Sequence, residues 1–115
     1  MSEVFDFGYG RVAAHRHENG GGWVANTAYV APSAYVGLDA RVFGEARVYD
    51  NARVFSDAWV YDNALVFGSA RVWGDARVFG AARVLGRAQV YDNARVSGRA
   101  RVFGKTVIYE GERNE

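Results

Sequence analysis

Aliphatic residues recur along this chain on a strict period of six. Val occupies every sixth position from Val24 to Val102, fourteen times in succession, and Ile108 continues the series. Two residues before these positions, Ala recurs thirteen times without a gap, from Ala28 to Ala100. The unit therefore reads Ala, usually Arg, Val, usually an aromatic residue, and then two residues drawn mostly from Gly, Asp, Asn and Ser.

The period of six predicts short strands and excludes a helix. Residues six apart on an α-helix are about 600° apart, so the Val series would spiral around the whole surface. In a strand, Ala and Val two residues apart face one side, while Arg and the aromatic residue face the other. Gly, Asp, Asn and Ser tolerate the backbone of a tight bend. Each hexad is therefore predicted to be one strand followed by one corner.

Strands this short cannot bury a face alone, so they must stack on copies of themselves as solenoid repeats do. The inward positions carry only Ala and aliphatic residues of moderate size, which implies a narrow interior. Every Phe, Tyr and Trp within the repeat falls at an outward position. The repeat therefore predicts an all-β solenoid with an aromatic exterior.

The repeat resembles that of the hexapeptide-repeat proteins, whose usual unit is an aliphatic residue, two or three turn residues and a small residue. The resemblance covers Trp23 to about Tyr109. It implies a left-handed parallel β-helix in which three hexads form one triangular coil, an exception to the usual right-handed crossover. Many members place Gly directly after the aliphatic residue, where this chain usually has an aromatic one. The chain also resembles small bacterial and phage hexapeptide-repeat proteins of unassigned role.

Three hexads per coil predict about five coils and a height of roughly 24 Å, at about 4.8 Å per coil. Residues eighteen apart should then stack into outward columns. The predicted aromatic columns are Phe55, Trp73, Tyr91 and Tyr109; Phe43, Tyr61 and Phe79; and Tyr49, Phe67, Leu85 and Phe103. Beside them we expect columns that are rich in Arg.

The two ends depart from the repeat. Residues 1–22 are expected to form an N-terminal cap, a β-hairpin followed by a Gly-rich loop, over a hexapeptide-repeat β-helix at 23–109. A cap is expected because an open coil presents unpaired backbone groups. Residues 110–115 read as a charged tail that leaves the lower edge partly open.

Acyl transfer is the first function that the resemblance implies, since many hexapeptide-repeat proteins are acyltransferases that use acyl-CoA or acyl-ACP. Their general base is usually a His presented at a subunit cleft. The two His of this chain, His15 and His17, both lie in the expected cap, and no loop interrupts the hexads. We therefore expect a non-catalytic structural or interaction module with no catalytic residue and no cofactor. The alternative is a small acyltransferase-like enzyme that uses acyl-CoA at a subunit interface.

Metal binding is a weaker possibility at the same His pair. His15, His17 and Glu18 are ligand types that zinc accepts. The hexapeptide-repeat carbonic anhydrases use three His from neighbouring coils, and the hexads of this chain have none. A polar cap strand with solvated His explains the pair without a metal.

The outward Arg and aromatic residues are the remaining candidate, as a binding surface. The chain has a net charge of +1, but the lower coils are basic: seven basic residues and one acid lie between Ala76 and Lys105. Arg and aromatic side chains together suit phosphate contact and base stacking, although cation–π contacts within the sheets would explain them equally. The expected surface residues are Arg53, Phe55, Arg71, Trp73, Tyr91, Tyr109, Arg77, Phe79, Arg83, Arg101 and Phe103.

Exposed aromatic residues on flat faces favour self-association, because monomers rarely expose large apolar patches. We expect a homo-oligomer, dimer or trimer, formed through the faces or the open end, with a polyanion as a further partner and no membrane association. The chain has no Cys and no apparent signal peptide, which suits the cytoplasm. A phage or virion origin is compatible with the resemblance.

Overall fold

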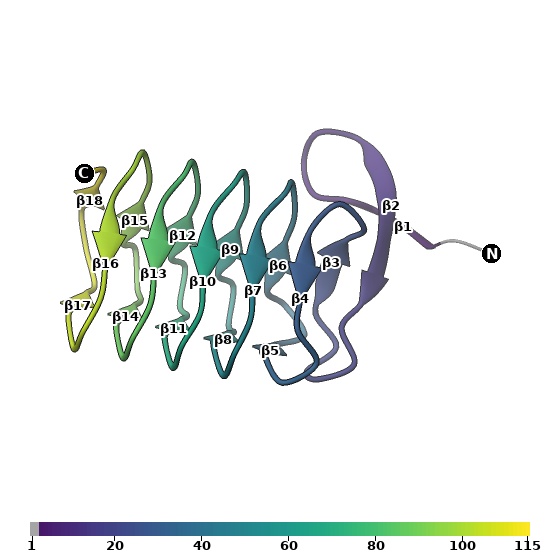
Figure 1. The fold of residues 1–115 in the computed structure, drawn as a ribbon. Helices are drawn as coiled ribbons and strands as arrows, with labels where there is room; N and C mark the ends of the chain where they lie inside the picture. The colour runs from purple at the N-terminus through teal and green to yellow at the C-terminus, as the bar shows by residue number, and fades with distance from the viewer. Residues whose placement is uncertain (1–2) are drawn as a thin grey trace.

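The computed structural model describes residues 3–115, and in this range it contains eighteen strands and no helix (Figure 1). The strands form a parallel β-solenoid of five coils with three strands in each. The predicted all-β solenoid is therefore confirmed.

Each of the three sheets takes one strand from every coil. Sheet A contains, in spatial order, β1 (Glu3–Asp6), β2 (Arg11–Arg16), β3 (Trp23–Ala25), β6 (Arg41–Val42), β9 (Trp59–Val60), β12 (Arg77–Val78), β15 (Arg95–Val96) and β18 (Glu112–Arg113). Sheet B contains β4 (Tyr29–Val30), β7 (Arg47–Val48), β10 (Leu65–Val66), β13 (Arg83–Val84) and β16 (Arg101–Val102). Sheet C contains β5 (Tyr35–Val36), β8 (Arg53–Val54), β11 (Arg71–Val72), β14 (Gln89–Val90) and β17 (Val107–Ile108).

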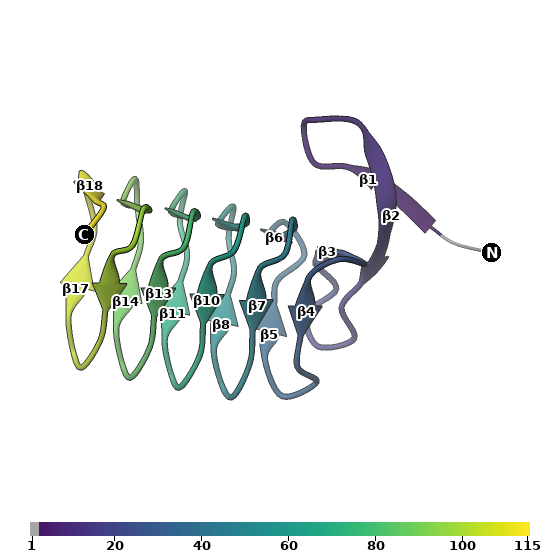
Figure 2. The same cartoon turned by 45° about the horizontal axis from the view of Figure 1, so that its top comes forward.

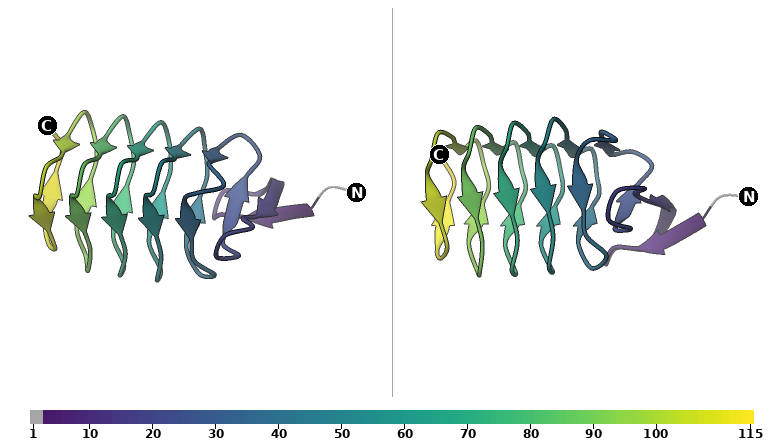
Figure 3. Two further views of the ribbon diagram at one scale, coloured as in Figure 1. Left: turned by 60° about the horizontal axis from the view of Figure 1, so that its bottom comes forward. Right: turned by 90° about the horizontal axis from the view of Figure 1, so that it is seen from below.

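From β3 to β17, paired strand residues are eighteen positions apart. Val54 lies opposite Val72 and Val72 opposite Val90, in parallel strands. The ladder extends past each strand, since the Phe55 amide donates to the Val72 carbonyl at 2.9 Å. Figures 2 and 3 show the result as coils stacked along one axis.

The core is a column of Ala and Val that runs through all five coils. The Val residues from Val36 to Val96 and the Ala residues from Ala46 to Ala100 have no exposed surface. Ile108 closes the column at the last coil and is 7% exposed. The second, third and fourth coils each contribute three Ala-and-Val pairs, so their interior is filled by small side chains alone.

The corners hold one residue per hexad in the left-handed region of backbone space. From Gly44 to Gly104 every sixth residue has a positive φ. Most are Gly, but four are not: Asp50, Ser56, Asp62 and Asp92 have φ of 59°, 56°, 58° and 53°. Asp50 offsets part of this strain, because its Oδ2 accepts a hydrogen bond from the Gly68 amide of the next coil at 3.1 Å.

The N-terminal residues extend sheet A. β1 and β2 pair as an antiparallel hairpin, and β2 pairs antiparallel with β3, so the parallel coils begin at β3. The loop that follows β2 covers the edge of β5: the Gly22 amide donates to the Val36 carbonyl, and the Val36 amide donates to the Asn19 carbonyl. Figure 2 shows the hairpin bending away from the stack at the N-terminal end.

The C-terminal residues add one more strand to the same sheet. β18 pairs parallel with β15, with Arg95 opposite Glu112. The segment expected as a charged tail at 110–115 therefore contributes a strand, while β16 and β17 are the last strands of sheets B and C.

Candidate interaction surface

The outward aromatic residues stack in columns on sheets A and C, while on sheet B Leu85 interrupts the column between Phe67 and Phe103. The coil spacing brings equivalent rings to stacking distance: Phe43 and Tyr61 have centroids 4.8 Å apart and planes 2° apart. On sheet C the centroid distances are 5.5 Å for Phe55 and Trp73, 4.5 Å for Trp73 and Tyr91, and 5.8 Å for Tyr91 and Tyr109. We call these columns the sheet A ladder (Phe43, Tyr61, Phe79), the sheet B ladder (Tyr49, Phe67, Leu85, Phe103) and the sheet C ladder (Phe55, Trp73, Tyr91, Tyr109).

The predicted surface residues lie on three different faces. Arg77 and Phe79 belong to sheet A, whereas Arg83, Arg101 and Phe103 belong to sheet B or directly follow it. The other six lie together on the outward side of sheet C: Arg53, Phe55, Arg71, Trp73, Tyr91 and Tyr109. The structure thus divides the predicted surface and makes sheet C its largest part.

The sheet A face is occupied by contacts within the chain. Arg77 and Arg41 both lie over the Trp59 ring, with their guanidinium carbons 4.4 Å and 5.2 Å from its centroid. The hairpin continues the stack, because Phe5 lies 4.8 Å from Trp23 and Phe7 lies 4.8 Å from Phe43. In the described part of the chain, all the Arg–ring contacts of this kind lie on this face.

The stacking on sheet A changes the chemistry of one tyrosine. Tyr61 lies between Phe43 and Phe79, at centroid distances of 4.8 Å and 5.0 Å. Burial in this ladder raises the pKa of the Tyr61 hydroxyl above its ordinary value of 10.0.

Both His side chains hold backbone or cap residues in place. His17 is 6% exposed, and its Nε2 lies 2.7 Å from the Ala34 carbonyl oxygen, to which it donates. His15 Nδ1 lies 2.6 Å from Asn26 Oδ1. Among residues 3–115 no three His, Asp or Glu side chains gather as a metal site would require.

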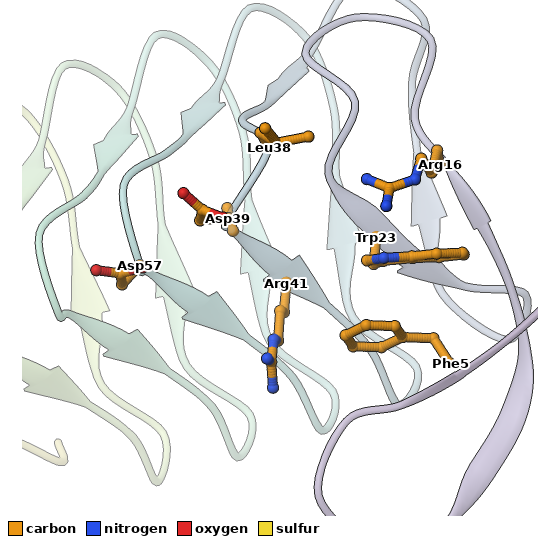
Figure 4. A pocket seen from close by; sticks show the side chains of 8 residues that line it. Phe5, Arg16, Trp23, Leu38, Asp39, Arg41 and Asp57 are labelled. Atoms are coloured by element: carbon orange, nitrogen blue, oxygen red, sulfur yellow. The ribbon is translucent and has the colours of Figure 1, made fainter.

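A shallow depression lies where the hairpin meets the first coils (Figure 4). Its volume is about 390 Å³, and Phe5 and Trp23 form one wall while Asp39 and Asp57 lie on the opposite side. Its Arg16 is already engaged, since Nη1 donates to the Gly21 carbonyl at 3.0 Å and the guanidinium lies 4.5 Å from the Trp23 ring. The depression therefore forms where the hairpin packs on the first coils, and the exposed carboxylates Asp39 and Asp57 line its far side.

The charged side chains at the corners are sorted by column, a feature that the linear sequence conceals. The corner between sheets C and A, called the C/A corner, comprises residues 38–39, 56–57, 74–75, 92–93 and 110. Each coil supplies one exposed acid to it and no base: Asp39, Asp57, Asp75, Asp92 and Glu110. Sequence reasoning missed this column, although the spacing of eighteen between its first three members was a signal.

The opposite side of sheet C is basic. The corner between sheets B and C, called the B/C corner, carries Arg87 and Lys105 in the last two coils, and Arg53 and Arg71 follow it directly in the two coils before. Ser69, Arg71, Arg87 and Gln89 line a hollow of about 280 Å³ on this side. The acid of this corner, Asp50, accepts the hydrogen bond from Gly68 described above.

The chain is similar to the repeat family described as YdcK beta solenoid repeat. The matched segments are residues 46–61, 58–73, 88–98 and 94–110, which together cover less than half of the chain and lie within the coils. No curated protein and no solved structure matches the chain. Within residues 3–115, no helix is long and apolar enough to cross a membrane.

Proposed function

We propose that this protein is a non-catalytic interaction module, a rigid β-solenoid whose exposed aromatic ladders mediate self-association. The observation that carries the proposal is the partly exposed apolar ladders on the outward faces of sheets B and C. Their inner members are half-buried, and the end members Phe103 and Tyr109 are 61% and 51% exposed. Flat apolar faces of this kind gain free energy when a second surface excludes water from them.

The roles of the two His support the non-catalytic part of the proposal. A general base needs a free ring nitrogen within reach of a substrate. His17 is buried with Nε2 on a backbone carbonyl. His15 Nδ1 is held by Asn26, which leaves Nε2 free, but this exposed side chain lines neither of the hollows described above.

The family resemblance supports a further part of the proposal, that the coils wind left-handed as in hexapeptide-repeat proteins. The hexad period, with strands of two residues and a positive φ at each corner, is compatible with that winding. An experimental electron-density map tests it, and a right-handed path of the chain would contradict it.

Self-association makes thermal stability depend on protein concentration, since only the folded chain forms the complex. We expect the melting temperature to rise by several degrees between about 5 µM and about 500 µM protein. The double variant Phe103→Ser/Tyr109→Ser should reduce this dependence. The control Val4→Ser/Tyr9→Ser removes side chains of similar exposure, 52% and 59%, outside the two exposed ladders, and should retain it.

The acyltransferase alternative makes the opposite prediction in a parallel measurement. Saturating coenzyme A should leave the melting temperature unchanged if the chain is an interaction module. A specific rise, together with acyl transfer that is lost on His15→Ala or His17→Ala, would show that the proposal is wrong.

A further inference from the structure

We propose that the outward side of sheet C pairs with the same face of a second copy, about a two-fold axis parallel to the solenoid axis. This inference rests on the proposed self-association and adds the face, the symmetry and the register. The partner is therefore a second copy of this chain, with its coils at the same heights.

The sheet C face carries opposite charges along its two margins. A strand of this face begins at the B/C corner and runs past an Arg position and then a ladder position to the C/A corner, as Arg71 and Trp73 show. From the second to the fifth coil, the basic margin holds Arg53, Arg71, Arg87 and Lys105, with one acid, Asp50, beside Arg53 in the second coil. In the same coils, the acidic margin holds Asp57, Asp75, Asp92 and Glu110. All nine side chains are exposed.

A two-fold axis parallel to the solenoid keeps the height of every coil and exchanges the two margins. Each basic side chain then meets the acid of the same coil in the partner, such as Arg71 opposite Asp75. The coil pitch is common to both margins, so the match holds from the second coil to the fifth. A perpendicular in-plane two-fold would instead place like margins together, which electrostatic complementarity disfavours.

The same operation brings the Arg column of one chain onto the aromatic ladder of the other. To reach the partner's Asp57 and Asp75, Arg53 and Arg71 would cross the partner's ladder, much as Arg77 lies over Trp59 within sheet A at 4.4 Å. Arg–ring contacts gain strength when water is excluded from them. The face therefore complements itself in its centre as well as along its margins.

The other two faces lack this complementarity. On sheet A the acidic C/A corner already lies beside the chain's own Arg column, and the hairpin residues Phe5 and Phe7 pack on the face. Sheet B lies between the basic B/C corner and a corner of mixed charge, with Glu45 in an upper coil and Arg99 in a lower one. Only sheet C has one basic and one acidic margin.

The size of the face predicts a weak complex. Five coils at about 4.8 Å and six residues per side at about 3.3 Å give a face of about 24 Å by about 20 Å. Pairing would bury about 500 Å² per chain and about 1,000 Å² in total, at the lower limit for a specific interface. We expect dissociation at micromolar protein concentration and in high salt.

The test uses two charge-reversed chains. The first, Arg53→Asp/Arg71→Asp, makes both margins acidic in the second and third coils, and the second, Asp57→Arg/Asp75→Arg, makes both basic. Each alone should dimerise at least about tenfold more weakly than the wild type, because attraction becomes repulsion at both symmetric sites. Mixed in equal amounts they should form a heterodimer, since every reversed residue then meets an opposite charge.

Arg47→Asp/Arg83→Asp is the matched control, because these exposed Arg occupy the equivalent positions on sheet B. It should dimerise as the wild type does. Light scattering of each chain and of the mixture gives the readout, and the single variants Arg71→Asp and Asp75→Arg replace any double variant that does not fold.

The outcomes separate this inference from the proposed function. A wild-type dimer that both charge-reversed chains retain, or that the sheet B control abolishes, overturns the assignment to sheet C and leaves self-association standing. A wild-type monomer overturns both. A monomer that binds single-stranded DNA, with binding lost on Arg53→Asp/Arg71→Asp, would identify the basic margin as a polyanion site instead.

Discussion

At the scale of single residues, the fold depends on which side chains the interior accepts. Three Ala-and-Val pairs fill each full coil, and most of these side chains have no exposed surface. Larger side chains would force the coil open, because packed interiors tolerate little added volume. The aromatic residues therefore occupy the outward positions, where the coil spacing stacks them.

Val72 lies in the middle coil and is the position where an interior charge should be most damaging. It is 0% exposed, so Val72→Asp would bury an unpaired carboxylate among apolar side chains. We expect that this variant fails to fold, as judged by far-UV circular dichroism. Arg83→Ala, at an exposed position on sheet B, should keep the wild-type melting temperature within a few degrees. A Val72→Asp chain with wild-type thermal stability would contradict the inward assignment of the Val column.

Substitutions at the corners should show how closely the backbones of successive coils approach each other. Gly74 has φ of +67°, and a Cβ added there would lie 2.6 Å from the amide nitrogen of Asp92. Gly74→Ala should therefore lower the free energy of unfolding by about 1–2 kcal/mol, measured by urea denaturation. Ser56→Gly, at an equivalent corner with φ of 56°, should change it by well under that amount. If Gly74→Ala is as stable as the wild type, the predicted steric clash of the added Cβ with Asp92 does not occur.

The inward and outward positions and the stacking of the rings could be predicted from the sequence, because both follow from the regular repeat. A period of six fixes the inward and outward positions, and a coil of three hexads brings Tyr49 and Phe67 together, as their 4.8 Å stacking confirms. The non-Gly corner residues were harder to anticipate. Asp50 has a positive φ, and its carboxylate accepts a hydrogen bond from the next coil that exists only after the coils have stacked.

At the scale of elements, the aperiodic ends could not be placed from the sequence. Nothing in residues 3–16 specifies which strand the hairpin joins, since pairing depends on a free edge that another part of the chain provides. The structure gives that edge to β3, and Phe5 and Phe7 then reach the sheet A face. The strand β18 was missed for the same reason: the edge it joins, on β15, lies in a different coil.

The hairpin should behave as a separate cooperative unit that is held to the coils by aromatic contacts. Phe7 is 2% exposed and packs against both Phe5 and Phe43, at 4.7 Å and 4.8 Å. Phe7→Ala should therefore speed hydrogen exchange at residues 3–16 by more than tenfold and leave the coils from β7 to β14 protected. Tyr9→Ala is the control, because Tyr9 is 59% exposed and its loss should leave exchange nearly unchanged. Faster exchange throughout the coils would show that the hairpin and the solenoid unfold together.

At the scale of the whole molecule, the arrangement of charge matters more than its sum. The net charge of +1 conceals an acidic column at the C/A corner and basic side chains on the other side of sheet C. These columns exist because each coil has three strands, which places residues about eighteen positions apart directly above one another. In an extended chain the same Asp residues would lie far apart. Six residues of this face could be proposed from the sequence as part of a binding surface, whereas the separation of its charged side chains into two margins required the fold.

The most direct test of the account is the solution mass of the wild-type chain, measured by light scattering after size exclusion in low and high salt. We predict a dimer at about 100 µM protein in low salt that dissociates in about 1 M salt, where charges are screened beyond about 3 Å. A monomer of 12.7 kDa under both conditions would contradict self-association through the ladders. A dimer unaffected by salt would contradict the role of the charged margins of sheet C.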